Sequence, residues 1–124
     1  RGLHLQKNKM QEKFVTVIKG KILDIVVDLR HNSKTFGKHF KIILSDKNAK
    51  SILIPAGFAH GFMGLEIENI ILYSNNKYRS QKDEMGLLWS DKNLKINLPK
   101  KKLIISKKDK ANMELAEFLK KLKK

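Results

Sequence analysis

Short apolar runs rich in β-branched residues, separated by turns, dominate this sequence and restrict the folds open to it. The runs at 14–18 and 22–29 flank Lys19-Gly20-Lys21, a sequence typical of a tight turn. Further strands are expected at 40–44, 52–54, 61–65, 70–73, 87–89, 94–96 and 103–105. Residues 31–37 and 45–50 are expected to form polar loops. Because no helical pattern separates these strands, the sequence predicts an all-β sandwich or barrel.

The C-terminal tail has a different periodicity. Its apolar residues recur at helical spacing, with lysines on the remaining face; they are Met113, Leu115, Phe118, Leu119 and Leu122. We therefore expect residues 1–110 to form the β-rich core domain and residues 111–124 to form an amphipathic helix that covers one end of it. A helix that binds a membrane surface or a partner protein is the alternative.

Length and composition narrow the class of protein. A chain of 124 residues is large enough for one hydrophobic core and too small for two. It contains no cysteine, so disulfides, thiolate metal ligands and a cysteine nucleophile are excluded within it. No apolar run approaches the length of about 20 residues that spans a bilayer. These features predict a cytoplasmic protein without a membrane partner.

The formal net charge of +15 raises the question of nucleic-acid binding. Only three of the 27 basic residues are arginine, the residue that base readout and bidentate phosphate contacts favour. The lysines are also spread along the whole chain. We therefore expect no nucleic-acid partner, although a basic surface would attract an anionic substrate. A basic nucleic-acid-binding barrel stays as an alternative, which predicts steeply salt-dependent binding to DNA or RNA.

Three separate segments carry polar side chains suited to proton transfer, at residues 1–6, 55–62 and 106–109. His4 and His60 are candidate bases, because the pKa of histidine lies nearest neutrality. Asp109 is a candidate partner that orients one of them, and Tyr73 is a candidate acid. For each histidine, a purely structural role satisfied by local hydrogen bonds is the alternative.

Metal binding is not expected. Small β-barrels often hold a metal with a His-x-His pair, but Gln6 stands where the second histidine after His4 would be. Asp24 lies on the opposite face of its strand from Leu23 and Ile25. If Asp24 is buried it needs a partner, for which His60 or Lys13 would serve.

Together these segments resemble the dTDP-4-dehydrorhamnose 3,5-epimerases. That family shows an Arg-Gly-Leu-His-aromatic-Gln opening, an Ile-Pro-x-Gly-Phe-Ala-His-Gly-Phe signature and a Ser-x-Lys-Asp ending. The corresponding segments here are residues 1–6, 54–62 and 106–109. Further matches are found at residues 13–15, 20–30, 33–37 and 89–91, and at Tyr73 and Tyr78 in a tyrosine-rich strand.

The resemblance implies a fold and a reaction. The fold is a cupin-like double-stranded β-helix, or jelly roll, that works as a homodimer without metal or cofactor. The substrate is a nucleotide-linked 4-keto-6-deoxyhexose, whose C3 and C5 centres are inverted through an enolate. An epimerase that inverts a single centre is one alternative, and a non-catalytic sugar- or nucleotide-binding jelly roll is another.

The resemblance also implies roles for individual residues. His4 is the base, Asp109 orients it, Tyr73 reprotonates from the opposite face, and Lys13 stabilises the enolate. The implied substrate contacts are Arg1 and Lys108 on the diphosphate, His60, Glu84 and Tyr78 on the sugar or nucleotide, and Asp24 as a buttress of the site.

The chain departs from the family pattern in several places, and one is residues 96–99, which read Ile-Asn-Leu-Pro where the family has Ile-x-Trp-Pro. Arg79 stands where the family has the second tyrosine of a Tyr-Tyr pair. Family members also carry a further segment before the Arg-Gly-Leu-His strand, which supplies nucleotide-binding groups. We therefore expect either an incomplete piece of a longer protein or a domain that lacks this nucleotide clamp.

Overall fold

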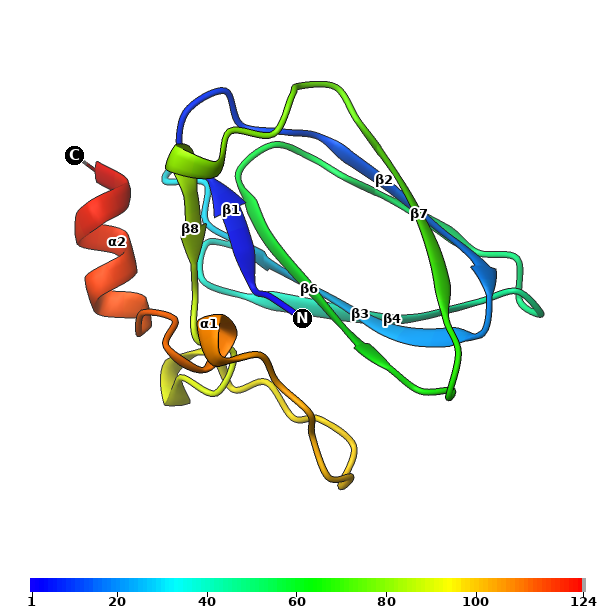
Figure 1. The fold of residues 1–124 in the computed structure, drawn as a ribbon. Coiled ribbons are helices and arrows are strands. Elements are labelled where there is room, and N and C mark those ends of the chain that lie inside the picture. Colours follow the sequence, from blue (N-terminus) through cyan, green and yellow to red (C-terminus); the bar gives the residue numbers. More distant parts are fainter. Residues whose placement is uncertain (124) are drawn as a thin grey trace.

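Two antiparallel β-sheets pack face to face in the computed structural model, which describes residues 1–123 (Figure 1). One sheet has five strands in the order β4-β3-β6-β1-β8, and the other has three in the order β5-β2-β7. The strands are β1 (His4–Gln6), β2 (Lys13–Lys19), β3 (Lys21–Asp28), β4 (His39–Ser45), β5 (Ser51–Ile54), β6 (Phe58–Gly64), β7 (Ile70–Asn75) and β8 (Glu84–Gly86). The sandwich expected from the spacing of the apolar runs is confirmed.

Strand β3 shows how the sequence builds this architecture. Ile22 and Val26 belong to the apolar cluster that also holds Val15 of β2, so this face of β3 is turned toward the three-stranded sheet. Ile25 and Val27, at the alternate positions, pack in a second cluster on the other side of the five-stranded sheet. Successive side chains of a strand point to opposite faces, so a strand covered on both sides is apolar almost throughout.

The turn between β2 and β3 forms as the sequence predicts. Gly20 has φ +91°, a conformation that disfavours residues with a Cβ atom. A Cβ there would also lie only 2.4 Å from the Asn69 side chain and the Glu68 carbonyl. Glycine is therefore required both by the backbone conformation and by the close approach of the segment before β7.

Three expected strands near the C-terminus, at 87–89, 94–96 and 103–105, are absent. Leu87 makes only an isolated bridge with Met113, Leu94 ends the short 3-10 helix η2 (Lys92–Leu94), and residues 103–105 have no regular secondary structure. Leu87 and Leu94, together with Ile96, are nevertheless buried in the core. These residues are apolar because an irregular segment of the chain is buried against the sheet. The pattern of apolar residues alone does not distinguish such a segment from a short buried strand.

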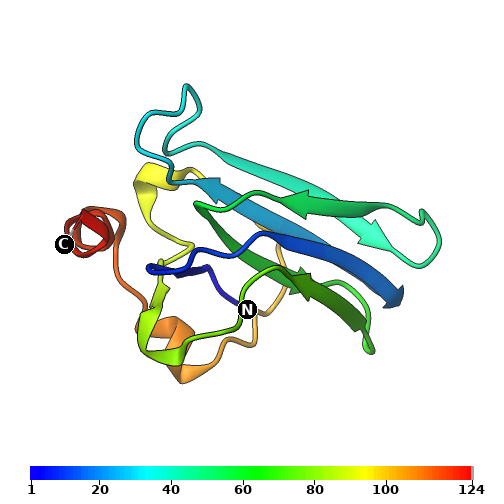
Figure 2. The same ribbon diagram turned by 90° about the horizontal axis from the view of Figure 1, so that it is seen from above.

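The C-terminal helix is confirmed as α2 (Leu115–Lys123). It begins four residues after the expected start at residue 111, and residue 124 lies outside the described residues. Phe118 is fully buried in the core, and Leu115, Leu119 and Leu122 pack against the same cluster. The helix therefore lies beside the β8 end of the larger sheet, with its apolar face covered (Figures 1 and 2). Within residues 1–123, no helix has the length and apolar character needed to cross a membrane.

Candidate active site

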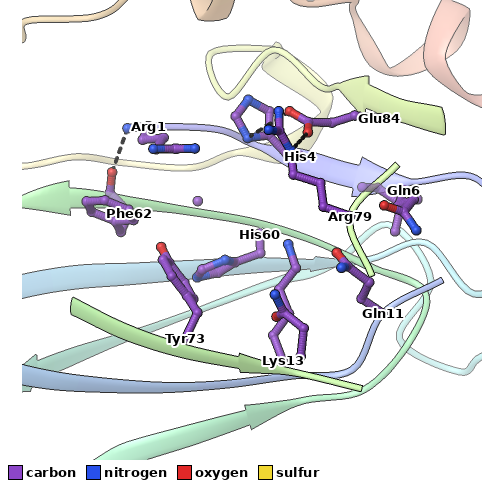
Figure 3. Close-up of a pocket in the computed structure, with 13 residues that line it drawn as sticks. Arg1, His4, Gln6, Gln11, Lys13, His60, Phe62, Tyr73, Arg79 and Glu84 are labelled. Atoms are coloured by element: carbon purple, nitrogen blue, oxygen red, sulfur yellow. Dashed lines mark hydrogen bonds and ion pairs between the residues drawn. The ribbon is translucent and has the colours of Figure 1, made fainter. Parts of the chain in front are cut away.

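A cavity of about 190 Å³ lies between the two sheets and gathers polar residues from both of them (Figure 3). The five-stranded sheet contributes His4 and His60, and the three-stranded sheet contributes Lys13 and Tyr73. The other lining residues are Arg1, Leu5, Gln6, Gln11, Gly61, Phe62, Asn75, Arg79 and Glu84. The cavity therefore combines groups that are far apart in the sequence.

Strand register explains why these side chains meet. His4 of β1 is paired with His60 of β6, so both imidazoles leave the same face of their sheet. In the other sheet, Tyr73 is paired with the buried Val15, and Lys13 is paired with Asn75. Alternation along β2 places Lys13 on the same face as Val15. The two sets of side chains thus point into the space between the sheets.

His4 and Asp109 form the first polar pair of the site. The Nε2 atom of His4 lies 2.7 Å from Oδ1 of Asp109, which is buried in the short helix α1 (Lys107–Lys110). The other carboxylate oxygen accepts a hydrogen bond of 3.2 Å from the amide of Gly2. Ser106 caps α1 by accepting from the Asp109 amide. An ionised Asp109 accepts a hydrogen bond from Nε2–H of His4, which leaves Nδ1 as the basic nitrogen.

The surroundings of this pair favour a neutral imidazole next to an ionised carboxylate. Burial lowers the pKa of His4 below its ordinary value, although the hydrogen bond and charge of Asp109 act in the opposite direction. Burial alone would raise the pKa of Asp109, but the bonds from His4 and the Gly2 amide lower it. His4 is therefore unprotonated at neutral pH and able to accept a proton.

His60 and Asp24 form a second, more deeply buried pair. Their Nε2 and Oδ1 atoms are 2.6 Å apart, and the exposed fractions of the two residues are 5 % and 1 %. Of the two partners that the sequence suggested for Asp24, the structure selects His60. The second oxygen, Oδ2, is buried and has no hydrogen-bond partner among the described residues. The pair fixes the orientation of the His60 ring.

Tyr73 packs against this second pair. Its ring meets that of His60 edge-on, with centroids 5.8 Å apart and an angle of 79° between the planes. Burial raises the pKa of the Tyr73 phenol to about 12, with a further contribution from the negative charge of Asp24. The phenol therefore keeps its proton across the physiological range and can act as an acid.

Lys13 supplies a cation inside the cavity. Burial lowers the pKa of its ammonium group, an effect that the charges of Glu84 and Asp24 partly offset. A buried ammonium group placed near a developing negative charge stabilises that charge more strongly than the same group would in water.

Glu84 lies at the edge of the cavity, held by two cations. Its carboxylate accepts hydrogen bonds from Arg79 Nε at 2.8 Å and Lys108 Nζ at 3.1 Å. It also lies 3.9 Å from Nδ1 of His4. Burial alone would raise the pKa of Glu84, but the bonds from Arg79 and Lys108 lower it to about 2. Glu84 is therefore a permanent anion beside the basic nitrogen of His4.

The remaining predicted site residues occupy different places. Arg1 lines the cavity, while Lys108 and Asp109 line an adjoining one of about 270 Å³ that shares Arg1, His4, Arg79 and Glu84 with the first. Tyr78 lines neither cavity, and its side chain is 98 % exposed. Its backbone carbonyl, rather than its ring, accepts a hydrogen bond from Gln6.

Sequence reasoning missed four polar residues that line the first cavity: Gln6, Gln11, Asn75 and Arg79. Asn75 follows Tyr73 at the alternation distance on β7, so the period of the strand carried a signal for it. Gln6 links the segment after β1 to the loop before β8, since its side chain bonds the Lys9 carbonyl and the Ser80 amide. No group of three or more His, Cys, Asp or Glu side chains within residues 1–123 is arranged to hold a metal ion.

Glycine next to His60 has a clear physical reason. A Cβ atom on Gly61 would lie 2.5 Å from the carbonyl oxygen of Arg1. That carbonyl accepts a hydrogen bond from the Phe62 amide, which pairs the start of the chain with β6. This close backbone approach brings Arg1 to the cavity wall.

Comparison with known proteins agrees with this geometry. The family model for dTDP-4-dehydrorhamnose 3,5-epimerase matches residues 1–117. The dTDP-4-dehydrorhamnose 3,5-epimerase of Methanothermobacter thermautotrophicus is 44 % identical over 112 residues, which cover 88 % of this chain and 60 % of that protein. The chain thus spans about three fifths of the length of this curated relative.

Solved structures show the same fold. The Bacillus anthracis dTDP-4-dehydrorhamnose 3,5-epimerase, determined with TDP and PPi bound, gives a TM-score of 0.90 at 44 % identity and covers 93 % of this chain and 66 % of its own. The Legionella pneumophila dTDP-6-deoxy-D-glucose-3,5-epimerase was determined in complex with dTDP-4-keto-L-rhamnose. It gives a TM-score of 0.92 at 35 % identity, and the match covers 98 % of this chain and 65 % of the Legionella chain. The fold is therefore the cupin-like jelly roll that the sequence predicted, and the chain belongs to the dTDP-4-dehydrorhamnose 3,5-epimerase family.

Proposed function

We propose that the protein containing this chain is an isomerase that converts dTDP-4-dehydro-6-deoxyglucose to dTDP-4-dehydrorhamnose by inverting C3 and C5, without a cofactor. One observation carries the proposal: His4, which is bonded to Asp109, and the protonated phenol of Tyr73 line the same cavity from different sheets. A base and an acid on different walls are what inversion through a planar intermediate requires.

The proposed reaction follows from the acidity of the substrate. The protons at C3 and C5 are each alpha to the C4 ketone, so a base can remove either of them to give an enolate. Nδ1 of neutral His4 takes the proton, and the Asp109 carboxylate stabilises the imidazolium that results. Lys13 offers its ammonium group to the negative oxygen of the enolate. Tyr73 then donates its proton to the opposite face of the carbon, which inverts the centre.

The proposed substrate contacts rest on positions around the two cavities. Arg1 and Lys108 are cations suited to the diphosphate, and Lys108 lies beside the catalytic pair in the adjoining cavity. His60 and Glu84 line the first cavity and suit hydroxyl groups of the sugar. Asp24 acts through His60. For the exposed Tyr78 the proposed contact is with the nucleotide outside the cavity.

Hydrogen exchange tests the proposal. The protein is incubated in heavy water with dTDP-4-keto-6-deoxyglucose, and the deuterium content of the recovered sugar is measured by mass spectrometry. Two deuterons above the enzyme-free control are expected. One deuteron would assign a single-centre epimerase instead, and no exchange by folded protein would favour a binding module. His4→Ala is the matched variant, because it should abolish exchange while leaving ligand binding largely intact.

We also infer a homodimer. The outer face of the three-stranded sheet exposes several large apolar side chains, including Phe14, Leu53 and Leu72, whose exposed fractions are 45 %, 61 % and 55 %. A patch of this kind on a sheet face is typical of a protein interface. Sedimentation should give the mass of two chains, and Leu72→Lys should shift the equilibrium toward the monomer. A monomer at all concentrations would contradict the inference.

A further inference from the structure

Arg79 occupies the boundary between the two cavities of the site. Its side chain lines both of them, together with Arg1, His4 and Glu84. It stands in the segment that leads from β7 to β8, and Figure 3 shows it beside Glu84, below His4. A ligand that extends from the first cavity into the second must pass this guanidinium group.

The hydrogen bonds of Arg79 leave most of its donors free. Nε donates to Oε2 of Glu84 at 2.8 Å, and this is the one hydrogen bond of the guanidinium within residues 1–123. The side chain is 57 % exposed. The four N–H groups on the two terminal nitrogens are therefore available, and their planar fork matches the oxygens of a phosphate group.

The local charges also favour an anion. Arg1, Arg79 and Lys108 surround the shared region, against the carboxylates of Glu84 and Asp109. Asp109 is already bonded to His4 and the Gly2 amide, and Glu84 is bonded to Arg79 and Lys108. Both carboxylates are engaged and the cations exceed them by one, so the shared region favours an anion.

We propose that Arg79 binds the diphosphate of the nucleotide sugar through its terminal nitrogens while Nε stays bonded to Glu84. This inference rests on the proposed function, since it assigns one further ligand to the same substrate. The resemblance to the family places a tyrosine at this position, so a contact through the guanidinium departs from the family pattern. It also ties the phosphate to Glu84, which lies 3.9 Å from the basic nitrogen of His4.

Titration calorimetry with inorganic pyrophosphate tests the assignment without requiring turnover. Arg79→Gln removes the charge and the fork and should weaken pyrophosphate binding about tenfold, the usual effect of losing a charged hydrogen-bonding partner. Lys77→Gln is the matched control, because Lys77 is exposed on the same segment, lines neither cavity and loses the same charge. Its affinity should stay within about twofold of that of the unsubstituted protein.

Two results would overturn the assignment. Equal affinities of Arg79→Gln and Lys77→Gln would show that Arg79 only braces Glu84, and no pyrophosphate binding by the unsubstituted protein would remove the anion site altogether. The outcome is independent of the proposed reaction. Failure of hydrogen exchange together with a selective loss of pyrophosphate binding in Arg79→Gln would contradict the reaction and leave the anion site standing.

Discussion

His4 and His60 are paired across β1 and β6, so that their imidazoles leave the same face of one sheet, yet each is bonded to a different aspartate. His4 is bonded to Asp109 from the C-terminal part of the chain, and His60 is bonded to Asp24 of β3. The His4 side chain is 15 % exposed and that of His60 only 4 %. The more accessible pair suits proton exchange with a ligand, and the buried pair suits support of the cavity wall.

The first prediction concerns the partner of His4. Asp109→Asn removes the negative charge that stabilises the imidazolium and allows the wrong tautomer of His4. We expect the rate of hydrogen exchange to fall by about 100-fold or more, while pyrophosphate still binds, because Asp109 is not one of its proposed contacts. Glu117→Gln, an exposed carboxylate of α2, is the control. A variant of Asp109 with undiminished exchange would remove the pair from the reaction.

The second prediction is the pH dependence of exchange. Because burial lowers the pKa of His4, the rate should rise with pH and reach its plateau with a midpoint below about 6.5. In Asp109→Asn the contributions that raise this pKa are lost, so the midpoint should move to lower pH. At high pH the rate should decline again as Lys13 loses its proton. Because burial lowers the pKa of Lys13 as well, the midpoint of this decline should lie below about pH 10.4. A decline only near pH 12, where Tyr73 titrates, would exclude Lys13.

A third prediction concerns stability in acid. Asp28 is 1 % exposed and bonded to Arg30, Ser33 and Thr35, which hold its pKa well below the usual range. A carboxylate with a depressed native pKa stabilises the fold fully above its unfolded pKa, and this contribution is lost as the pH falls below about 4. Asp28→Asn should cost about 2 kcal/mol at pH 7.

Chemical denaturation at pH 7 and pH 3 measures this effect. The difference between Asp28→Asn and the unsubstituted protein should shrink at the lower pH. At pH 3 the unfolded chain takes up a proton at Asp28, which favours unfolding of the unsubstituted protein, while the folded protein keeps this carboxylate ionised. The control is Asp46→Asn, in an exposed turn, where the amide oxygen of asparagine can still accept the hydrogen bond from the Gly20 amide. If the difference in the free energy of unfolding is the same at both pH values, Asp28→Asn destabilises the fold through altered packing or hydrogen-bond geometry and not through loss of the negative charge.

The fourth prediction concerns the attachment of the C-terminal helix. Asp91 accepts from the Asn93 amide with one carboxylate oxygen and from the Leu115 amide with the other, so it caps η2 and the start of α2 together. Asp91→Ala should destabilise the fold by about 1–2 kcal/mol. Thermal unfolding checks this value. Glu117→Gln, further along α2, should change the melting temperature little, and equal effects of the two substitutions would contradict the capping role.

The sequence predicted the elements that repeat a simple pattern. Alternation in β3 predicted the strand and the position of Asp24 on the face opposite Leu23 and Ile25, because the pleat of a strand fixes where each side chain points. The helical spacing of Phe118 and its neighbours likewise predicted α2. These elements depend on local geometry that the sequence carries directly.

Other features depend on contacts between distant segments. Strand β8 contains only Glu84, Met85 and Gly86, and it is a strand because β1 lies beside it. The contacts of Glu84 with Arg79 and Lys108 require β8, the preceding loop and α1 to be placed in space first. The resemblance to the family named Glu84 and Lys108 as site residues, but no local pattern could supply their geometry or the part played by Arg79.

The most direct test of the account compares exchange with inversion in Tyr73→Phe. Removing the phenol should leave the His4–Asp109 base intact, so the substrate should still take up deuterium while the inverted product disappears. Mass spectrometry gives the deuterium content, and proton NMR of the same sample gives the configuration at C3 and C5. Exchange with retained configuration is the result that the account predicts. Inversion by Tyr73→Phe at the rate of the unsubstituted protein would contradict it.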